Sequence, residues 1–389
     1  MQGHVRWLLA AALGTLGGCP GDSHREYHVI RPMVLIGGGL PDKGARKAAN
    51  AYTRWVVREV SDMPDDYSPA EEFDSESYVA VEGSGIPGGG LGWDQGIAPV
   101  SGAVVLFAGG IDPGTGKASR KAYLYDGGSD TWTTLPEMNA ARQGHTAAAL
   151  AEGRVLLAGG TDGSGALLKS SEVFDPGTRR FVVGPEMAAA RVLHRAVTLQ
   201  DGRVLILGGD NKTGRAFEIY DPKADAFVSA GQMVSDASTA TLLLDGRVLV
   251  AGGFDTAFVQ IFDPARGTFT RIADMPNAHS MGARASRLAD GRVLVTGGWS
   301  QMRRASAYAH LYDPRTDAWT AVCPMGSARA LHGQVTLHDG RVLVCGGLDD
   351  DGDILASAEI FDPASRTFTT LRSAMAFGRY RLGAVALAR

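Results

Sequence analysis

The chain has 389 residues, of which 44% are hydrophobic, and a formal net charge of −4. This apolar content suffices for one large globular body, and a charge so close to balance excludes the strong basic field that nucleic-acid binding needs. The 52 glycines are about twice the usual share, which predicts many turns and close backbone approaches.

The N-terminus has the layout of an export signal. Arg6 is followed by an apolar run too short to cross a bilayer, and then by small residues before Cys19. The letters LGGC that end at Cys19 resemble the bacterial lipobox, whose cysteine becomes lipidated after cleavage. We therefore expect residues 1–19 to be a signal peptide, with Cys19 anchoring an exported protein in the bacterial envelope, periplasmic or at the cell surface. The alternative is a simple signal peptide with an unmodified cysteine.

Residues 20–100 contain no repeat and are interpreted as an N-terminal extension. The stretch 43–60 places alanine, tyrosine and valine side chains along one side at helical spacing, which predicts an amphipathic helix. Residues 61–82 hold eight acidic residues and no basic one, and 83–92 are mostly glycine. We expect an exposed linker there.

From residue 101 onward one phrase recurs six times. Its clear copies are EGRVLLAGG, DGRVLILGG, DGRVLVAGG, DGRVLVTGG and DGRVLVCGG, with a looser copy, SGAVVLFAGG, at 101–110. The period of 44 to 50 residues predicts a propeller or a similar array of repeats. This spacing is measured between the first glycines of successive pairs: Gly109, Gly159, Gly208, Gly252, Gly297 and Gly346.

Each unit predicts four strands. An Asp-Gly or Glu-Gly pair fits a two-residue hairpin turn before the second strand, and the apolar second strand fits a position covered on both faces. An acidic residue and a proline end most of the third strands, and a methionine near the end of the fourth predicts core packing. The fourth strand also carries one aromatic residue that is expected to fill space between blades: Trp132, Phe181, Phe227, Phe269, Trp319 or Phe368.

The glycine pair, the acidic-proline turn, the spaced aromatic and an Arg-x-x-His start together resemble the kelch repeat, in the form common in bacterial exported proteins. The resemblance covers about 103–389 and implies an all-β propeller of four-stranded blades. We assign 101–389 to six blades closed by the C-terminal strand, because RYRLGAVALAR at the chain end has the form of a first strand. That strand is expected to complete the first blade. A seven-bladed ring is the alternative, since MVLIGGG at 33–39 imitates the glycine-pair strand.

Alternate connections of an antiparallel blade emerge at the same end. The loops after the glycine pairs and the links between blades therefore share one face of the disc, which we call the loop face. Its segments are the longer and more varied ones, so a binding site is expected there. The segment 299–308 combines Trp299 with Arg303 and Arg304, residue types found in binding hot spots, and is the predicted contact loop.

Arginine recurs in four of the links, four residues after the methionine, and two roles fit it. On the loop face it would bind carboxylate or sulfate groups of a ligand; alternatively it ties blade to blade through Glu172, Glu218 and Glu359. Histidines three residues further on, His145, His194 and His332, lie in different blades and do not predict a metal site. The arginines concerned are Arg142, Arg191, Arg329 and Arg379.

The sequence predicts no cofactor. Asp349, Asp351 and Asp353 are weak calcium candidates, because EF-hand spacing would need glycine at 354 and an exposed acidic loop explains the run equally well. A Gly-x-Gly-x-x-Gly pattern begins at Gly83, but proline and glycines inside and after it prevent the helix that a dinucleotide site requires.

Kelch proteins include galactose oxidase, a copper radical enzyme that uses two tyrosines, two histidines and a cysteine cross-linked to tyrosine. That ligand set does not map onto this chain, so the resemblance implies the scaffold without the copper site. Cys323 and Cys345 lie in repeat strands, and two separate buried thiols are expected, with a disulfide as the alternative.

Two functions follow from these observations. The first is a non-catalytic binding module that holds an unknown protein or glycan on its loop face, with a membrane contact through lipid on Cys19. The second is a carbohydrate-active or copper-dependent oxidase of the galactose-oxidase-like type, with its chemistry hidden in variable loops. The absence of a recognisable catalytic constellation beside clear repeats favours the first.

Overall fold

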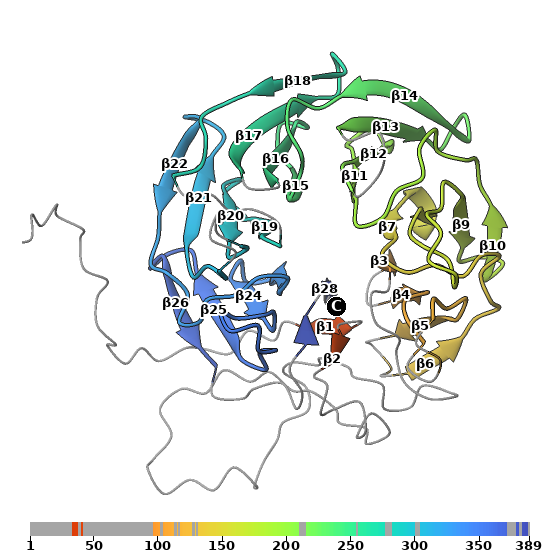
Figure 1. Ribbon diagram of the computed structural model, residues 1–389, viewed down its shortest axis with the longest axis horizontal. Helices are drawn as coiled ribbons and strands as arrows, with labels where there is room; N and C mark the ends of the chain where they lie inside the picture. The colour runs from red at the N-terminus through yellow and green to blue at the C-terminus, as the bar shows by residue number, and fades with distance from the viewer. Residues whose placement is uncertain are drawn as a thin grey trace, which may run out of the picture.

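A computed structural model describes residues 33–37, 40–41, 96–101, 104–112, 115, 117–126, 129, 131–209, 215–253, 256–276, 282–299, 304–371, 379–380 and 383–387. They form an all-β propeller of six four-stranded blades (Figure 1). Within these residues no helix has the length and apolar character that crossing a bilayer requires. The predicted signal peptide with Cys19, the helix at 43–60 and the linker at 61–92 lie outside the described residues.

Every blade is a continuous antiparallel sheet in chain order, as the repeat predicts. Blades 1 and 2 consist of β3 (Gly96–Ser101), β4 (Val104–Ala108), β5 (Ala122–Asp126), β6 (Thr131–Thr134), and β7 (Thr146–Ala149), β8 (Val155–Ala158), β9 (Ser171–Asp175), β10 (Arg180–Val183). Blades 3 and 4 consist of β11 (Arg195–Thr198), β12 (Val204–Leu207), β13 (Ala216–Asp221), β14 (Ala226–Gln232), and β15 (Thr239–Leu242), β16 (Val248–Gly253), β17 (Thr256–Asp263), β18 (Thr268–Arg271). Blades 5 and 6 consist of β19 (Arg284–Arg287), β20 (Val293–Thr296), β21 (Ala309–Asp313), β22 (Ala318–Ala321), and β23 (Gly333–Thr336), β24 (Val342–Cys345), β25 (Ala358–Asp362), β26 (Thr367–Thr370).

The turn between first and second strands is the predicted two-residue hairpin in blade 2, where Glu152 and Gly153 both have positive φ and Arg154 N–H donates to the carbonyl of Ala151. The Asp-Gly turns of blades 3 to 6 differ from that prediction. In blade 3, Leu199 N–H donates to the carbonyl of Arg203 at 2.8 Å, which encloses three residues, and only Gly202 among them has positive φ, at 87°. A three-residue loop with glycine in the left-handed region is the next most common hairpin connection. The arginine that follows donates from Nε to Asp201 Oδ2 at 2.7 Å and so braces the turn.

The two glycines of a pair lie against two successive links between blades. A Cβ on Gly159, whose φ is +65°, would lie 2.6 Å from the carbonyl oxygen of Arg191. A Cβ on Gly160 would lie 2.5 Å from the carbonyl oxygen of Gln143. Neither position has room for a side chain, which confirms that the pair lets backbones meet where blades converge.

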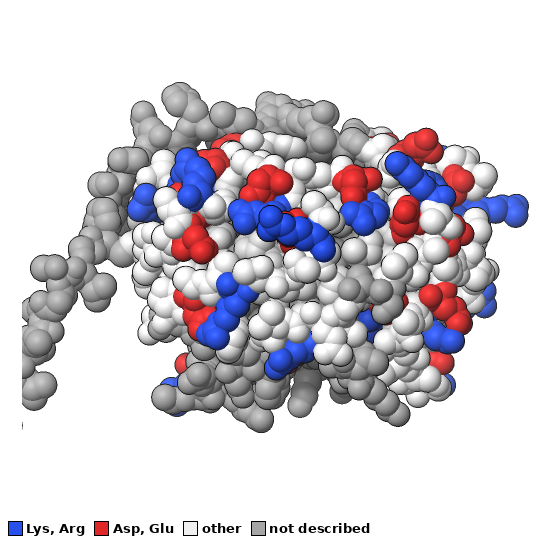
Figure 2. Space-filling model, turned by 90° about the horizontal axis from the view of Figure 1, so that it is seen from above, with Lys and Arg blue, Asp and Glu red and all other residues white. Residues whose placement is uncertain are grey.

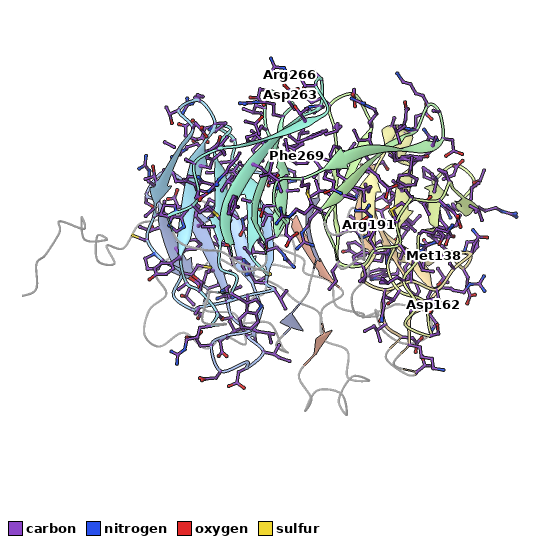
Figure 3. All side chains as sticks on the ribbon, turned by 45° about the horizontal axis from the view of Figure 1, so that its top comes forward. Met138, Asp162, Arg191, Asp263, Arg266 and Phe269 are labelled. Atoms are coloured by element: carbon purple, nitrogen blue, oxygen red, sulfur yellow. The ribbon has the colours of Figure 1, made fainter. Side chains whose placement is uncertain are left out.

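The fourth-strand aromatics fill space between neighbouring blades. Phe181 packs on Phe174 with ring centroids 5.2 Å apart, and both belong to one core cluster with Leu106 and Leu124 of blade 1. Phe269, labelled in Figure 3, contacts rings of blades 3 and 4 in the same way. The methionines are buried in these clusters, as predicted: Met138, Met187, Met233, Met275 and Met325.

The C-terminal strand closes the ring, but not as expected. β28 (Gly383–Leu387) pairs with β1 (Met33–Gly37), and β27 (Arg379–Tyr380) pairs with β2 (Leu40–Pro41). This sheet lies between blades 6 and 1, where β28 contacts β23 and β3 (Figure 1).

The expectation that β28 completes blade 1 was therefore wrong, because blade 1 has its own first strand, β3. The proline in β3 is tolerated because an innermost strand keeps a free edge, and a β-bulge follows it. Residues 33–37, which belong to the segment that resembles the glycine-pair strand, form β1 and pair with β28.

Gly159→Ala tests the close approach of backbones. We expect it to lower the free energy of unfolding by about 2–4 kcal/mol, since it adds a clash to an unfavourable φ. Gly163→Ala in the adjacent loop is the control, because a Cβ there meets nothing within 4 Å. Urea unfolding measures both, and equal midpoints for the two variants would contradict the packing described above.

Candidate functional site

The loops and links share one face, as predicted. Single β-bridges join the start of a loop to its return, and others join a link to the neighbouring loop, as in Gln143↔Thr161 and Ala330↔Leu348. Asp162 in the loop of blade 2 and the turn containing Asp263 and Arg266 lie at opposite ends of Figure 3. The bridges that close loops are Ile111↔Ala118, Thr161↔Leu167, Trp299↔Ala305 and Leu348↔Ile354.

Arg142, a predicted loop-face arginine, is buried in the blade that its link enters. Its Nη2 donates to Glu172 Oε1 at 2.7 Å, and its Nη1 donates to the carbonyl oxygens of Gly159 and Ser170 at 2.9 and 3.1 Å. The same carboxylate accepts the backbone N–H of Asn139 at 2.6 Å. One glutamate therefore holds both the arginine and the backbone of the link.

Two further links repeat this network. Arg191 pairs with Glu218 at 2.6 Å, and Arg329 pairs with Glu359 at 2.7 Å; Figure 3 shows Arg191 within the ring of blades. All three arginine side chains are 0% exposed. They present no surface to a ligand in this structure, and the contacts give them the structural role of tying blades together. The side chain of Arg379 lies outside the description.

In blade 4, other residues stand in place of both the arginine and the glutamate of this pair. Gln260 takes the register position of Glu218, and Ala237 takes the link position of Arg191. Gln260 still holds its link, because its Oε1 accepts the N–H of Val234 at 2.9 Å. An unpaired buried charge costs about 3–5 kcal/mol, so the arginine and glutamate are expected to be kept or lost as a unit.

Glu218→Gln alone should lower the free energy of unfolding by about 3–5 kcal/mol, because it leaves Arg191 buried without its counter-charge. The double variant Arg191→Ala/Glu218→Gln copies blade 4 and should lose less than the single variant. Urea unfolding of the wild type, both single variants and the double variant gives the coupling free energy. Strictly additive losses would show that the two side chains act independently.

His194 is a neutral packing group. Its Nε2 lies 2.9 Å from Oγ1 of Thr146, and its ring packs over Gly159, where a Cβ would be 2.8 Å from Cε1. Burial, aided by the charges of Arg191 and Arg195, lowers the pKa of His194 to about 3. Burial also lowers the pKa of His145 well below its ordinary value.

Acidification should weaken the fold. The unfolded state takes up a proton on His194 with the ordinary pKa of 6.5, whereas the folded state stays neutral down to about pH 3. The free energy of unfolding should therefore fall as pH drops through this window, by up to about 1.4 kcal/mol per pH unit for this residue. His194→Gln should reduce the slope. Denaturant midpoints between pH 7 and pH 5 measure it, and an unchanged slope in His194→Gln would refute the assignment.

The acidic loop of blade 6 uses its first carboxylate on its own backbone. Asp349 Oδ1 accepts the N–H groups of Asp351 and Asp353 at 3.1 and 2.8 Å. Asp162 accepts two N–H groups in the same manner in the loop of blade 2, where no acidic run is present. The geometry of Asp349 is that of a turn-forming residue. In the described part of the chain no group of three or more His, Cys, Asp or Glu side chains is placed to hold a metal.

The two cysteines in the repeats do not pair with each other. Cys345 is a free thiol, fully buried, and burial raises its pKa to about 12. The side chain of Cys323 is partly exposed. The expectation of a buried thiol therefore holds for Cys345 alone.

The predicted contact loop starts from blade 5. Trp299 follows the glycine pair directly and is partly exposed, and its bridge to Ala305 forms the base of the loop. Arg304 is exposed, and Arg303 lies outside the described residues. Tyr308, which the sequence analysis did not select, is 56% exposed where the loop enters β21.

Blade 5 departs from the pattern of internal cross-links at this point. Tyr308 stands where blades 2 and 6 have Ser170 and Ser357, and the buried His310 takes the register position of Glu359. The rings of Tyr308 and His310 have centroids 6.5 Å apart. Aligning AYAHLYD with ASAEIFD shows both changes, so the repeat carried the signal that could have found Tyr308.

Opposite charges alternate on the surface. Figure 2 shows Lys and Arg side chains interleaved with Asp and Glu over the side of the molecule that it displays. On the loop face, Lys121 pairs with Asp112 at 2.7 Å and Lys169 with Glu186 at 2.6 Å. Among the described residues, these pairs and the side shown in Figure 2 carry charges of both signs.

Comparison with known proteins agrees with this architecture. A kelch motif matches residues 332–375, which span blade 6. Blade 6 therefore contains a kelch motif, and the described residues form a six-bladed β-propeller of such repeats. No curated protein matches its sequence at a significant level.

Two solved structures show the same fold at low identity. One is a novel fungal alcohol oxidase of the AA5 family in complex with copper, with 18% identity, a TM-score of 0.61, and coverage of 77% of this chain and 67% of that chain. The other is the structure of YjhT, with 14% identity, a TM-score of 0.57, and coverage of 72% and 97%. At such identities the likeness concerns the fold alone.

The described residues do not fit a copper centre of the galactose-oxidase type. His145, His194 and His332 lie in three different links, each against the glycines where two blades converge. The thiol of Cys345 faces the carbonyl of Gly333 inside blade 6. These donors do not converge on a common point, so no copper chemistry is derived for them.

Proposed function

We propose that the protein is a non-catalytic binding module that holds a protein or glycan on the loop face of blade 5. The observation that carries the proposal is the exposed Tyr308 beside Trp299 and Arg304, in a blade that has neither the serine nor the glutamate of the internal cross-link. Where blades 2 and 6 use these positions for internal cohesion, blade 5 has an exposed tyrosine, with Trp299 and Arg304 in the same loop.

The chemistry of these side chains suits recognition. Tyrosine and tryptophan offer large rigid apolar faces with one polar handle, and arginine adds a charged donor fork. Such residues dominate binding hot spots and also stack on sugar rings. A loop with a bridged base keeps them on a rigid support, which lowers the entropy lost on binding.

The proposal includes the cellular setting predicted from the N-terminus. Export and lipidation at Cys19 would tether the propeller to the bacterial envelope, where proteins and glycans are both at hand. Globomycin sensitivity of processing, or mass spectrometry of the mature N-terminus, tests this setting separately from binding.

Trp299→Ala and Tyr308→Ala should each weaken binding at least about tenfold, which corresponds to about 1.4 kcal/mol. Binding is measured on a glycan array and by capture from envelope extract, with partners identified and their affinities then determined on purified material. Val183→Ala, at an exposed position on the outer strand of blade 2, is the control and should bind as wild type.

Unchanged affinity in both aromatic variants would remove this loop from the site. The same preparation should be assayed for copper content and for peroxide release on a panel of sugars. Copper-dependent turnover would contradict the non-catalytic binding module and support the oxidase alternative.

A further inference from the structure

The link that enters blade 2 carries a buried histidine without a hydrogen-bond partner. His145 is 7% exposed, and neither its Nδ1 nor its Nε2 meets a partner among the described residues. Two residues earlier, the buried Oε1 of Gln143 also has no partner in this part of the chain. Buried polar atoms of folded proteins almost always form a hydrogen bond, so these atoms call for a group that the chain itself does not supply.

The equivalent histidines of two other links are bonded at Nε2, and the partner is a threonine hydroxyl in both. His194 Nε2 lies 2.9 Å from Oγ1 of Thr146, and His332 Nε2 lies 2.8 Å from Oγ1 of Thr296. The three rings occupy the same place in the repeat, because Cε1 of each lies 2.7 to 2.9 Å from the position that a Cβ would take on a first glycine. These glycines are Gly109 for His145, Gly159 for His194 and Gly297 for His332.

Blade 1 supplies no hydroxyl at this place. Thr146 stands opposite Ala158 in blade 2, and Gly96 takes the same register position in blade 1, opposite Ala108. The hydroxyl of Thr296 comes from the second strand instead, but the residue at that position of blade 1 is Ala108. The hydroxyl that the other two junctions contain is therefore missing beside the histidine of this one, together with the side chain that would carry it.

The ring of His145 is neutral at pH 7. Burial, aided by the charge of Arg142, lowers its pKa well below the ordinary value. A neutral imidazole donates from one nitrogen and accepts at the other, and a hydroxyl can answer either of them. A carboxylate only accepts and an ammonium only donates, so a hydroxyl is the group that suits this ring best.

Gln143 extends the unpartnered polar surface along the link. The other two links have Val192 and Ala330 at this position, so the amide is a feature of this junction. A Cβ on Gly160 would lie 2.5 Å from the carbonyl oxygen of Gln143 and 3.0 Å from Cβ of His145, so both side chains leave the link at the same point of the blade. Gln143 is partly exposed in a link of the loop face, which gives a ligand access to it.

We infer that the junction of blades 1 and 2 is a subsite for a neutral sugar, in which His145 and Gln143 each bind one of two neighbouring hydroxyl groups. One sugar hydroxyl takes the role that Thr146 and Thr296 have at the other two junctions, and the second donates to the amide oxygen of Gln143. A small number of placed polar groups of this kind fixes the orientation of a ligand. The subsite lies outside the aromatic loop of blade 5, so it does not rest on the function proposed for that loop.

Titration of the full chain with the methyl glycosides of glucose, galactose, mannose and N-acetylglucosamine tests the subsite. Isothermal calorimetry and saturation-transfer NMR should show saturable binding of at least one of them. Tetrahydropyran, which has the ring without the hydroxyl groups, should show none. Absence of binding for all four glycosides would overturn the inference and leave an ordered water as the partner of His145.

Two variants remove the polar atoms of the subsite while they keep its packing. His145→Phe retains a ring without nitrogens, and Gln143→Val copies Val192 in the link that enters blade 3. Each should weaken glycoside binding at least tenfold. Gln232→Val, at an exposed position of β14, is the control and should bind as wild type. Wild-type affinity in either subsite variant would refute the assignment of that residue to the sugar.

Gly96→Thr supplies the missing hydroxyl from the chain itself. It should weaken glycoside binding at least tenfold, because the threonine then occupies the place of the ligand. In the absence of sugar it should unfold at a higher temperature than Gly96→Val, which has the same shape without the hydroxyl. Equal unfolding temperatures for these two variants would show that His145 has no need of a hydroxyl and would contradict the inference.

Discussion

The approach of backbone to backbone at each glycine pair is the constraint on which the ring depends. The two glycines touch successive links, one entering their own blade and one entering the next, at distances that leave no room for a Cβ. Each blade is thereby set against its neighbours at its narrow end. The wedge shape follows, because the aromatic residues of the fourth strands fill the wide end. Small residues near the axis and large ones near the rim make a disc from repeated sheets.

The buried arginine–glutamate pairs support this close approach. Each pair holds in place the link between blades that lies against the glycines. In blades 2, 3 and 6 the pair is ionic, and in blade 4 glutamine holds the link without charge. The repeat can therefore vary its chemistry while it keeps its geometry. Blade 5 uses this freedom differently, because an exposed tyrosine and a buried histidine replace the serine and the glutamate. Such departures from a repeat indicate where selection has acted on something other than cohesion.

Much of the fold could be predicted from the sequence because the same pattern of strands and turns recurs in six repeats. Strand order, shared faces, glycine roles and aromatic fillers all follow from local patterns with known geometry. Ring closure could not be predicted in detail, because β3 contains Pro99 and is a weak strand by propensity, yet it pairs along β4. The length of the Asp-Gly turns in blades 3 to 6 was misjudged, since Asp-Gly fits both two- and three-residue loops.

The site was harder to predict, for a physical reason. A buried arginine and an exposed arginine carry the same letter, and only packing distinguishes Arg142 from Arg304. The glutamate partners were recognisable from the alternation of the third strand, and that interpretation proved the correct one. Tyr308 was missed because its importance becomes visible only when blade 5 is aligned with blades 2 and 6, which have serine at this position.

The pairing of β1 with β28 joins residues 33–37 to residues 383–387. Because about 350 residues separate the partners, this contact has the highest sequence separation among the described strand pairs and the largest loop-closure entropy of them. Synthesis of residues 383–387 must precede it, so the growing polypeptide remains an open arc with an unpaired edge until then. Chaperones that cover exposed strand edges would act during that interval. If a protein of this kind crosses a membrane before it folds, its ring would close only after translocation.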